Sequence, residues 1–331
     1  MNKKYYSLRS LLGNDWAYFF ITVGARGVGK TFSAQDYVLR QWKKNKVPFT
    51  WIRLSAISRD KLLANNATKF IDPKLVKKYD LELTTNGMDV YDHGEPMAKV
   101  LALSEMAKEK GVALFDGNND KPLNIVTDEF QREPQERITF DLAYNLVGTL
   151  ENLCRNRTHG VKIIMLCNQL EQANDILMAL NFIPEKHGRY KLKRKKAVVD
   201  YVPNSNEYIE ERKNTVAGIL GNEQSNFTNE FTVDRTLLCK KGKRLRHPEY
   251  LIKFSKNKAD WFVVWDGNVV ARYNKEKLPV AIPMRPYLDE KYDKKRADAI
   301  LKCYNIRGYR FKDLTTQLYF QKLLALLKPK G

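Results

Sequence analysis

The chain has 331 residues, 43% of them hydrophobic and 29% charged, and it carries a formal net charge of +20. That length allows one large domain or two modest ones, and the sequence has neither an apolar run of about 18 residues nor a signal-type start. We therefore expect a cytoplasmic protein with no membrane partner. The four cysteines form no CxxC pair, which predicts free thiols, buried at Cys154 and Cys167, and no metal site built from protein side chains alone.

Strand and helix signals alternate in the first half of the chain. Short apolar runs rich in aromatic and β-branched residues predict four buried strands. They are residues 17–23, 47–54, 123–127 and 161–167. Apolar residues at helical spacing predict one helix over 30–44 and another over 142–154. Strands that alternate with helices predict an α/β fold with a mainly parallel sheet covered on both faces.

The pattern changes near Pro184, and the sequence predicts three parts. They are an α/β domain at 1–183, a polar linker module at 184–230 and a basic domain at 231–331. In the last part, strand signals at 261–265 and 269–273 flank an Asp-Gly turn, which indicates a hairpin. A leucine-rich helical end follows, so we expect an α+β domain.

Positive charge is concentrated in the second half of the chain. Residues 1–182 have a net charge of +4, whereas residues 183–331 have +16. Because phosphates attract Lys and Arg over long range, this asymmetry indicates a polyanionic partner such as DNA or RNA. The basic runs 191–196 and 240–246 are the candidate contacts, and solvated loops explain them equally well.

A glycine-rich turn follows the first predicted strand and matches the pattern GxxxxGK[ST] in full. The matching residues are Gly24, Ala25, Arg26, Gly27, Val28, Gly29, Lys30 and Thr31. In such a loop, glycines let backbone N–H groups converge on phosphate oxygens, and the following helix adds its positive N-terminus. Lys30 is expected to reach the β- and γ-phosphates and Thr31 to ligate Mg²⁺. The sequence thus predicts binding of ATP and Mg²⁺.

Polar residues end two later strands. Asp128 and Glu129 follow the strand at 123–127, and Asn168 follows the strand at 161–167. We expect Asp128 to hold Mg²⁺ or its water shell and Glu129 to orient and deprotonate the attacking water. Because strand C-termini line the ligand crevice of a parallel sheet, Asn168 is a candidate for contacting the γ-phosphate or positioning the water. A turn-forming role explains Asn168 equally well.

Several cations are candidates for contacting phosphates across a subunit boundary. Arg155 and Arg157 close the helix before the strand at 161–167, where a cation also complements the helix dipole. The alternative role is an arginine finger, which neutralises transition-state charge in a neighbouring subunit. Arg26, inside the turn, is a further candidate. Lys108 and Lys110 are most simply surface lysines.

Together these motifs resemble those of DNA-packaging ATPases of phi29-like tailed phages. The similarity lies in residues 24–30, Asp128–Glu129–Phe130, Arg155–Asn156–Arg157 and Leu166–Cys167–Asn168, in that order. The resemblance implies an additional-strand P-loop core, a linker domain, and an RNase H-like C-terminal domain without nuclease activity. It also implies a homopentameric ring on the viral portal or connector, a structural packaging RNA as partner, and Arg155 as the residue that acts in trans.

We therefore expect an ATP-driven translocase that packages double-stranded DNA into a preformed capsid, acting in the host cytoplasm at the portal vertex. The alternative is a nucleotide-switched nucleic-acid-binding module, such as a replication accessory protein or RNA-binding regulator, that does not translocate. A helicase is a third option, for which the sequence has no additional motif set. The acids of the second half form no convincing two-metal cluster, so we expect no nuclease activity. The candidate metal-binding acids are Asp234, Asp260, Asp266, Asp289 and Asp293.

Overall fold

The structure is a computed structural model, and the chain splits into two compact units. One comprises Met1–Leu180 with Lys186–Phe231, and the other Asn181–Glu185 with Thr232–Gly331. The residues that the structure describes are 5–25, 27–105, 122–130, 142–155, 157–168, 175–180, 182–184, 186–204, 206–213, 215, 235–240, 244–254, 261–273 and 294–325. Over these ranges, no helix combines the length and the apolar character needed to cross a membrane.

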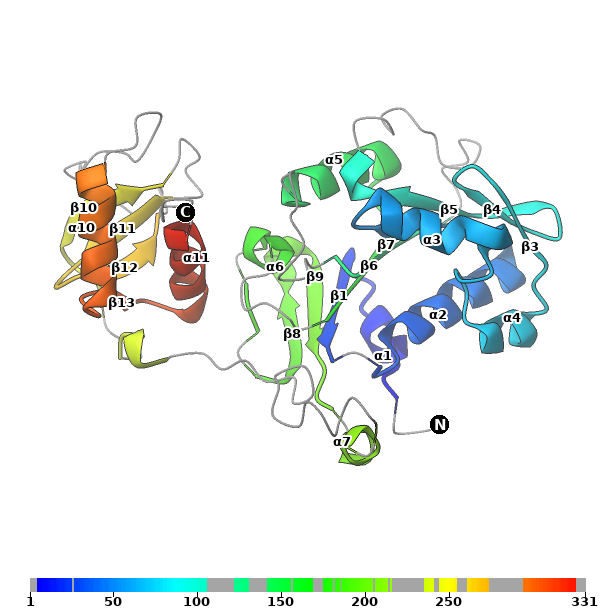
Figure 1. The fold of residues 1–331 in the computed structure, drawn as a ribbon, viewed down its shortest axis with the longest axis horizontal. Helices are drawn as coiled ribbons and strands as arrows, with labels where there is room; N and C mark the ends of the chain where they lie inside the picture. The colour runs from blue at the N-terminus through cyan, green and yellow to red at the C-terminus, as the bar shows by residue number, and fades with distance from the viewer. Residues whose placement is uncertain are drawn as a thin grey trace. The chain divides into compact units, whose positions relative to one another are not determined.

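The first unit is built on a nine-stranded sheet with the order β3-β4-β5-β2-β6-β7-β1-β9-β8 (Figure 1). The strands are β1 (Phe19–Gly24), β2 (Phe49–Arg53), β3 (Leu83–Asn86), β4 (Asp89–Asp92), β5 (Glu95–Ala102), β6 (Leu123–Asp128), β7 (Val161–Asn168), β8 (Gly188–Leu192) and β9 (Ala197–Tyr201). The adjacent strands β5-β2-β6-β7-β1-β9 are parallel to one another, whereas β3, β4 and β8 pair antiparallel with their neighbours. The predicted mainly parallel α/β sheet is therefore confirmed.

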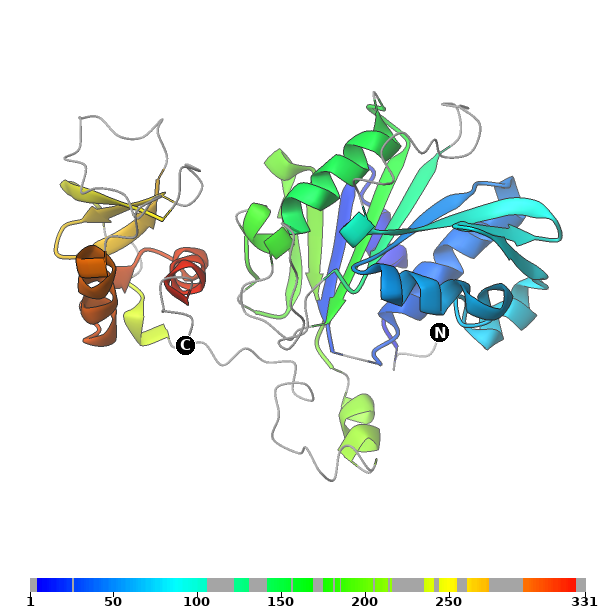
Figure 2. The same ribbon diagram turned by 45° about the horizontal axis from the view of Figure 1, so that its top comes forward.

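Helices cover both faces of this sheet (Figure 2). They are α1 (Arg9–Leu12), α2 (Lys30–Asn45), α3 (Ala56–Ala67), α4 (Pro73–Tyr79), α5 (Leu142–Cys154), α6 (Asp175–Ala179) and α7 (Asn206–Lys213). The connection β1-α2-β2 advances along the strand order in one direction and β6-α5-β7 in the other. Because such crossovers are right-handed, opposite directions place α2 and α5 on opposite faces.

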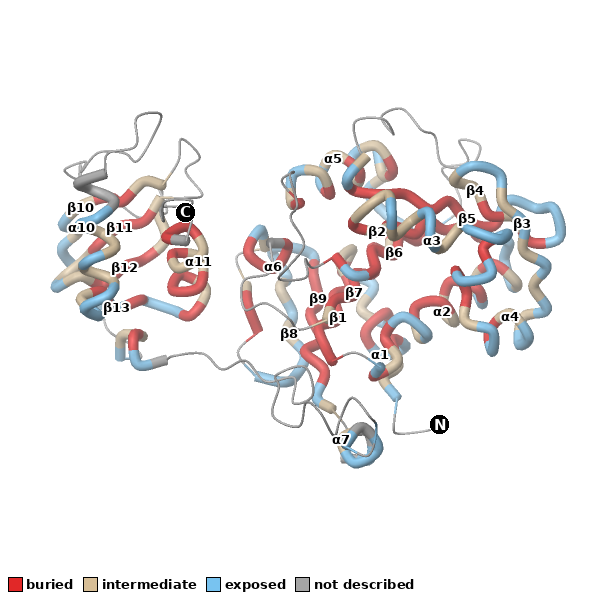
Figure 3. Tube along the Cα trace, viewed as in Figure 1, coloured by how far each residue is buried: buried red, intermediate tan, exposed pale blue. Residues whose placement is uncertain are grey.

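The central strands are buried along almost their whole length (Figure 3). On the face covered by α1 and α2, the core includes Leu11, Val38, Trp42, Trp51 and Ile164. Val38 and Trp42 lie one helical turn apart on α2, so the predicted helix buries one stripe against the sheet. This packing holds β1 and α2 rigidly on either side of the turn that connects them.

Strand β7 lies between β1 and β6, so one additional strand separates the glycine-rich turn from the acidic strand end. The parallel register aligns Gly24 of β1 with Asn168 of β7, and Asp128 of β6 with Leu166 of β7. All three strands therefore end at the same edge of the sheet, and their polar residues meet there.

The sheet also includes β8 and β9, which belong to the predicted linker module. The predicted boundary between residues 183 and 184 therefore does not coincide with the end of the sheet. Strand β9 is buried at every position, including Asp200, which Arg189 and Tyr6 contact at 2.6 and 2.7 Å. These partners make burial of the carboxylate tolerable. The apolar run that forms β9 is short and directly follows the basic run at 191–196. For this reason the sequence predicted a polar linker here.

An antiparallel extension at the other side of the sheet was not predicted from the sequence. Strands β4 and β5 are joined at His93 and Gly94, both with positive φ, as a two-residue hairpin turn requires. Asp92, buried at the end of β4, accepts hydrogen bonds from Trp42 and Lys43 of α2, each at 2.8 Å. These bonds and that from the Glu82 amide hold the pKa of Asp92 down to about 2, although burial opposes them.

The second unit has a four-stranded sheet of order β10-β11-β12-β13. Its elements are β10 (Pro248–Lys253), β11 (Trp261–Trp265), β12 (Val269–Arg272), α10 (Lys294–Asn305), β13 (Arg310–Phe311) and α11 (Leu314–Ala325). The predicted hairpin is confirmed, with positive φ at Gly267 and Asn268. Phe262 and Phe320 form the centre of its core with ring centroids 5.1 Å apart. The α+β content agrees with the prediction, although helix α10 was not predicted.

All four cysteines are free thiols. Cys167 is buried in β7, and burial raises the pKa of its thiol to about 12. Cys154, at the end of α5, is only partly buried, so the prediction of a buried thiol at this position is wrong. The helix turns one side of its last residue toward solvent, which the apolar spacing alone did not reveal.

Candidate functional site

The glycine-rich turn connects the end of β1 to the start of α2. Gly27 and Gly29 have φ of 84° and 94°, a backbone region that residues with a Cβ adopt at a cost. Gly24 faces a different constraint, because a Cβ there would lie 3.2 Å from the Cβ of Val202. Ala25 and Val28 are buried and pack together. Arg26 lies outside the described residues.

Lys30 is the first residue of α2 and is buried, with 6% of its surface exposed. Its Nζ donates hydrogen bonds to the carbonyl oxygens of Gly24 and Ala25 at 2.8 and 2.7 Å. It also donates to the side-chain oxygen of Asn168, at 3.1 Å. The turn thus holds the ammonium group at its own centre, and Asn168 reaches it from the neighbouring strand β7.

Thr31 and Asp128 face each other across the same edge of the sheet. The Thr31 hydroxyl donates to Asp128 Oδ1 at 3.3 Å, although β1 and β6 are separated by β7. A hydroxyl and a carboxylate oxygen are the ligand types that Mg²⁺ accepts, together with phosphate oxygens and water. The donor set present therefore fits a magnesium ion bound with a nucleotide.

Arg53 is a site residue that the sequence analysis missed. It ends β2, which pairs with β6, and its guanidinium contacts Asp128 at 2.9 Å and also the carboxylate of Glu129. Its side chain is 14% exposed, so these contacts lie in a partly desolvated setting. A polar residue at the end of the strand at 47–54 was the only available signal, because the pairing of β2 with β6 is not readable from spacing.

Glu129 directly follows β6 and has a left-handed backbone, with φ of 53°. This conformation costs a non-glycine residue about 1 kcal/mol or more. The side chain is 50% exposed, whereas that of Asp128 is 8% exposed. The next residue, Phe130, is fully buried and fixes the chain beyond this bend. Two adjacent carboxylates therefore have different environments, as different roles require.

The buried carboxyl group of Asp128 is electrostatically perturbed. Burial raises the pKa of its carboxyl group to about 6, with a smaller contribution from the charge of Glu129. Arg53, the Thr31 hydroxyl and Lys30 act in the opposite direction. Perturbed carboxyl groups of this kind are concentrated at functional sites. The free carboxyl group is thus poised to gain a proton just below neutral pH.

This pKa leads to a pH prediction. Because Mg²⁺ binds the deprotonated carboxylate, protons compete with the metal once the pH falls below about 6. We expect the Mg²⁺ concentration that gives half-maximal ATP hydrolysis to rise about tenfold per pH unit below 6, and to be nearly constant above 7. Titrating Mg²⁺ at pH 5, 6, 7 and 8 measures this. An equal Mg²⁺ requirement at pH 5 and pH 7 would contradict the assignment of Asp128 to the metal.

Arg155 and Arg157 lie far from these residues within the same chain. They line a pocket of about 290 Å³ together with Tyr18 and Phe19, at the start of β1. The turn lies at the other end of that strand, five residues and about 17 Å further on. Arg155 is exposed and has φ of 46° at the end of α5. It does not join the site of its own chain, so a direct role in hydrolysis requires another subunit.

The remaining predicted contacts are placed only in part. Lys108 and Lys110 lie outside the described residues. Residues 191–196 form the end of β8 and a short helical turn at Lys193–Lys195, and their basic side chains are exposed. Of residues 240–246, positions 240 and 244–246 are described, and Arg244 and Arg246 are exposed.

Comparison with known proteins adds a decisive observation to this geometry. Residues 1–301 match the family described as podovirus DNA encapsidation protein (Gp16). The chain belongs to this family. A DNA packaging protein of Bacillus phage phi29 is 25% identical over 242 residues, which cover 72% of this chain and 69% of the phage protein. The predicted resemblance to phi29-like packaging proteins is confirmed.

Solved structures give the same picture of the fold of this DNA encapsidation family member. The bacteriophage phi29 genome packaging motor assembly matches 98% of this chain and 100% of its own, with a TM-score of 0.66 and 17% identity. The N-terminal domain of the phi29 DNA packaging ATPase matches 61% of this chain and 98% of its own, with a TM-score of 0.50 and 22% identity. At these identities the likeness establishes the fold.

Proposed function

We propose that this member of the DNA encapsidation family is the ATPase of a viral DNA-packaging motor, which couples ATP hydrolysis to movement of double-stranded DNA into a preformed capsid. The observation that carries the proposal is the convergence of Lys30, Asp128 and Glu129 at one edge of the sheet. Family membership supplies the DNA-packaging context, since the relatives are named DNA packaging proteins.

ATP binds with its β- and γ-phosphates against the turn at 24–31, where backbone N–H groups and Lys30 compensate their charge. Thr31 and Asp128 would hold Mg²⁺, which would neutralise charge on the phosphate oxygens. To reach the phosphates, the Lys30 ammonium exchanges its hydrogen bonds to the Gly24 and Ala25 carbonyls for phosphate oxygens. When the Lys30 ammonium moves, its hydrogen bond to the Asn168 side chain is either kept or broken. This bond couples the movement to the end of β7.

Glu129 is the proposed general base. Its carboxylate orients water for attack on the γ-phosphate and accepts the proton. In this structure the Arg53 guanidinium contacts the Glu129 carboxylate. Binding of the attacking water to this carboxylate therefore requires Arg53 to release Glu129 while keeping Asp128, a rearrangement at the end of β2.

Arg155 is the proposed arginine finger, supplied by the adjacent subunit of a homopentameric ring. Its position beside the start of β1, at the opposite end of that strand from the turn of its own chain, supports action in trans. The ring is proposed to act at the portal vertex in the host cytoplasm, with the connector and a structural packaging RNA as further partners. The basic second half, with a net charge of +16, is proposed to contact these nucleic acids.

We further propose that the second unit has an RNase H-like shape but cuts no DNA. Asp266, the described member of the predicted acids, accepts bonds from the amides of Arg246 and His247 at 2.8 and 3.1 Å. It therefore joins the hairpin turn to the segment that precedes β10. Asp234, Asp260, Asp289 and Asp293 lie outside the described residues.

The experiment that tests the function is an ATPase assay with and without empty viral heads and double-stranded DNA, on the wild type and Lys30→Ala. We expect heads plus DNA to stimulate turnover, and Lys30→Ala to lose ATP binding by about 100-fold, because a charged hydrogen-bonding group of about 3 kcal/mol is removed. Lys44→Ala, which truncates an exposed lysine in the last turn of the same helix, is the matched control and should retain turnover.

Three results would reject this function. Normal ATP binding by Lys30→Ala would remove the phosphate site. A single-turnover rate that DNA and heads leave unchanged would favour the alternative, a nucleotide-switched binding module, and strand displacement of a forked duplex would favour the helicase.

A further inference from the structure

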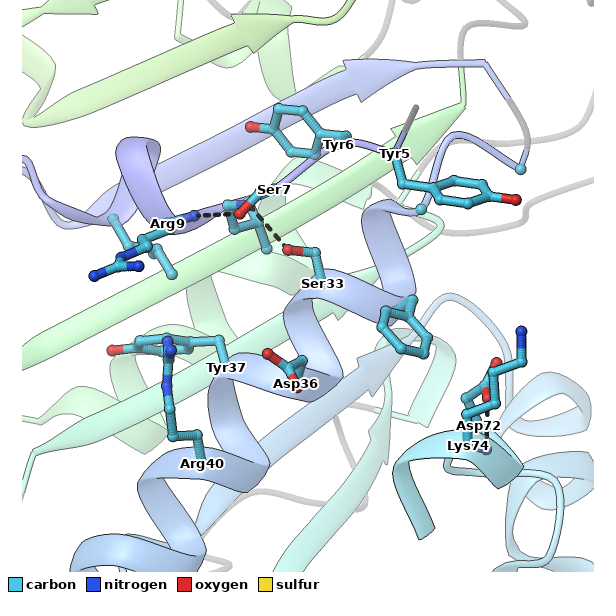
Figure 4. A pocket seen from close by; sticks show the side chains of 15 residues that line it. Tyr5, Tyr6, Ser7, Arg9, Ser33, Asp36, Tyr37, Arg40, Asp72 and Lys74 are labelled. Atoms are coloured by element: carbon cyan, nitrogen blue, oxygen red, sulfur yellow. Dashed lines mark hydrogen bonds between the residues drawn. The ribbon is translucent and has the colours of Figure 1, made fainter. Parts of the chain in front are cut away.

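A pocket of about 630 Å³ adjoins the glycine-rich turn, on the side where α2 begins (Figure 4). Its walls come from the N-terminal segment around Tyr5 to Leu12, from the turn at Gly27 and Gly29, and from the exposed side of α2. The proposed function uses none of the aromatic side chains in these walls.

The pocket lies at the correct end of the turn for the nucleoside. Lys30, Asp128, Glu129 and Asn168 mark the end at which the γ-phosphate reacts, and none of these four is among the described residues that line the pocket. The α-phosphate, the sugar and the base must leave the turn at its other end. Gly27, Gly29 and Phe32 line the pocket and flank that exit.

Two aromatic rings border the pocket beside this exit. Tyr5 and Phe32 keep 49% and 40% of their surface exposed, unusual values for large aromatic side chains next to a packed helix. In Figure 4 the ring of Tyr5 lies beside the turn. Phe32, in the first turn of α2, lines the same pocket. Tyr5 is close to the turn itself, because a Cβ on Gly29 would lie 3.3 Å from the Cβ of Tyr5.

The segment that carries Tyr5 is fixed in place. The Tyr6 amide donates to the Val28 carbonyl and the Leu8 amide to the Ser33 hydroxyl, both at 2.9 Å. The Tyr6 hydroxyl donates to Asp200 at 2.7 Å, and Arg189 binds the same carboxylate. The N-terminal segment is therefore tied to the turn, to α2 and to β9, and the position of Tyr5 is set before a ligand arrives.

We propose that Tyr5 and Phe32 form the binding site for the base of the nucleoside triphosphate, which stacks against their rings; this rests on the proposed binding of ATP at the turn. Stacking on aromatic side chains suits a purine, because its two fused rings present a large π-face. Asp36 does not read the base, since its carboxylate already accepts bonds from Lys78 and Tyr79 at 2.5 and 2.9 Å. Affinity for the base comes from the ring faces.

The test compares ATP with inorganic tripolyphosphate, which has the phosphates but neither sugar nor base. Binding of each, with Mg²⁺, is measured by calorimetry on the full chain. Tyr5→Ala and Phe32→Ala are expected to weaken ATP about tenfold and to leave tripolyphosphate within about twofold of wild type. Tyr5→Phe keeps a stacking ring and should bind ATP normally. Ile57→Ala, which truncates an apolar side chain that is 70% exposed elsewhere on the unit, is the matched control.

The outcomes separate this proposal from the function on which it rests. Unchanged ATP binding in both alanine variants overturns the base site. Equal weakening of ATP and tripolyphosphate also overturns it, because the rings would then act only through the shape of the turn. If Lys30→Ala binds both ligands as well as wild type, the phosphate site itself is wrong, whatever Tyr5 and Phe32 show.

Discussion

Replacing Arg155 by alanine is expected to lower ATP turnover in the assembled motor by about 10³-fold or more, with ATP binding nearly unchanged. An arginine that neutralises transition-state charge contributes an effect of this size and adds little to ground-state binding. Because Arg155 lies at the opposite edge of the sheet from its own turn, the loss should appear only where subunits meet. Steady-state turnover on heads plus DNA, with calorimetric ATP affinity, measures both quantities.

A mixing experiment distinguishes action in trans from action in cis. Arg155→Ala subunits keep an intact phosphate site, and Lys30→Ala subunits keep an intact arginine. Mixed rings should recover part of the activity that each pure variant lacks, because some interfaces combine Lys30 of one subunit with Arg155 of the next. Arg157→Ala is the matched control and should retain most activity. The finger assignment fails if mixtures stay inactive, or if Arg157→Ala is the variant that loses turnover.

Replacing Glu129 by glutamine should abolish hydrolysis and preserve nucleotide binding. The amide keeps the size of the side chain but cannot accept a proton, and loss of a general base typically costs about 10²–10⁴ in rate. ATP should remain bound, because Lys30, Thr31 and Asp128 are untouched. Single-turnover hydrolysis measured beside ATP affinity gives both numbers.

Arg53→Met supplies the comparison for this variant. It removes the guanidinium that contacts both acids but leaves Glu129 able to take a proton. Its defect should therefore be smaller than that of Glu129→Gln, and it should be accompanied by weaker Mg²⁺ binding through Asp128. If Glu129→Gln hydrolyses ATP at the rate of the wild type, Glu129 is not the base.

The sequence predicted those parts of the site whose functional residues are consecutive in the chain. The turn at 24–31 and the acids 128 and 129 each follow a strand, and strand ends gather at one edge of a parallel sheet. The predicted hairpin around Gly267 was equally local, since its positive φ values follow from residue type.

What the sequence did not predict depends on strand order. Arg53 belongs to the site only because β2 pairs with β6, a contact between distant segments that no spacing encodes. Strand β9 was hidden because its buried Asp200 resembles a loop residue until Arg189 and Tyr6 are placed beside it. Tyr5 stood in a short segment without periodicity, and its position beside Gly29 appears only in three dimensions.

The outer strands of the nine-stranded sheet have a consequence for how copies of this protein can crowd together. Strand β3, at one border, has four residues, and β8, at the other, has five with exposed Arg189 and Lys191. A short border strand, and one that carries charge as β8 does, is a poor template for backbone pairing with a second sheet. Neighbouring molecules can therefore be held at high local concentration without intermolecular strand pairing, which limits aggregation. Specific association is then left to the helical faces of the unit.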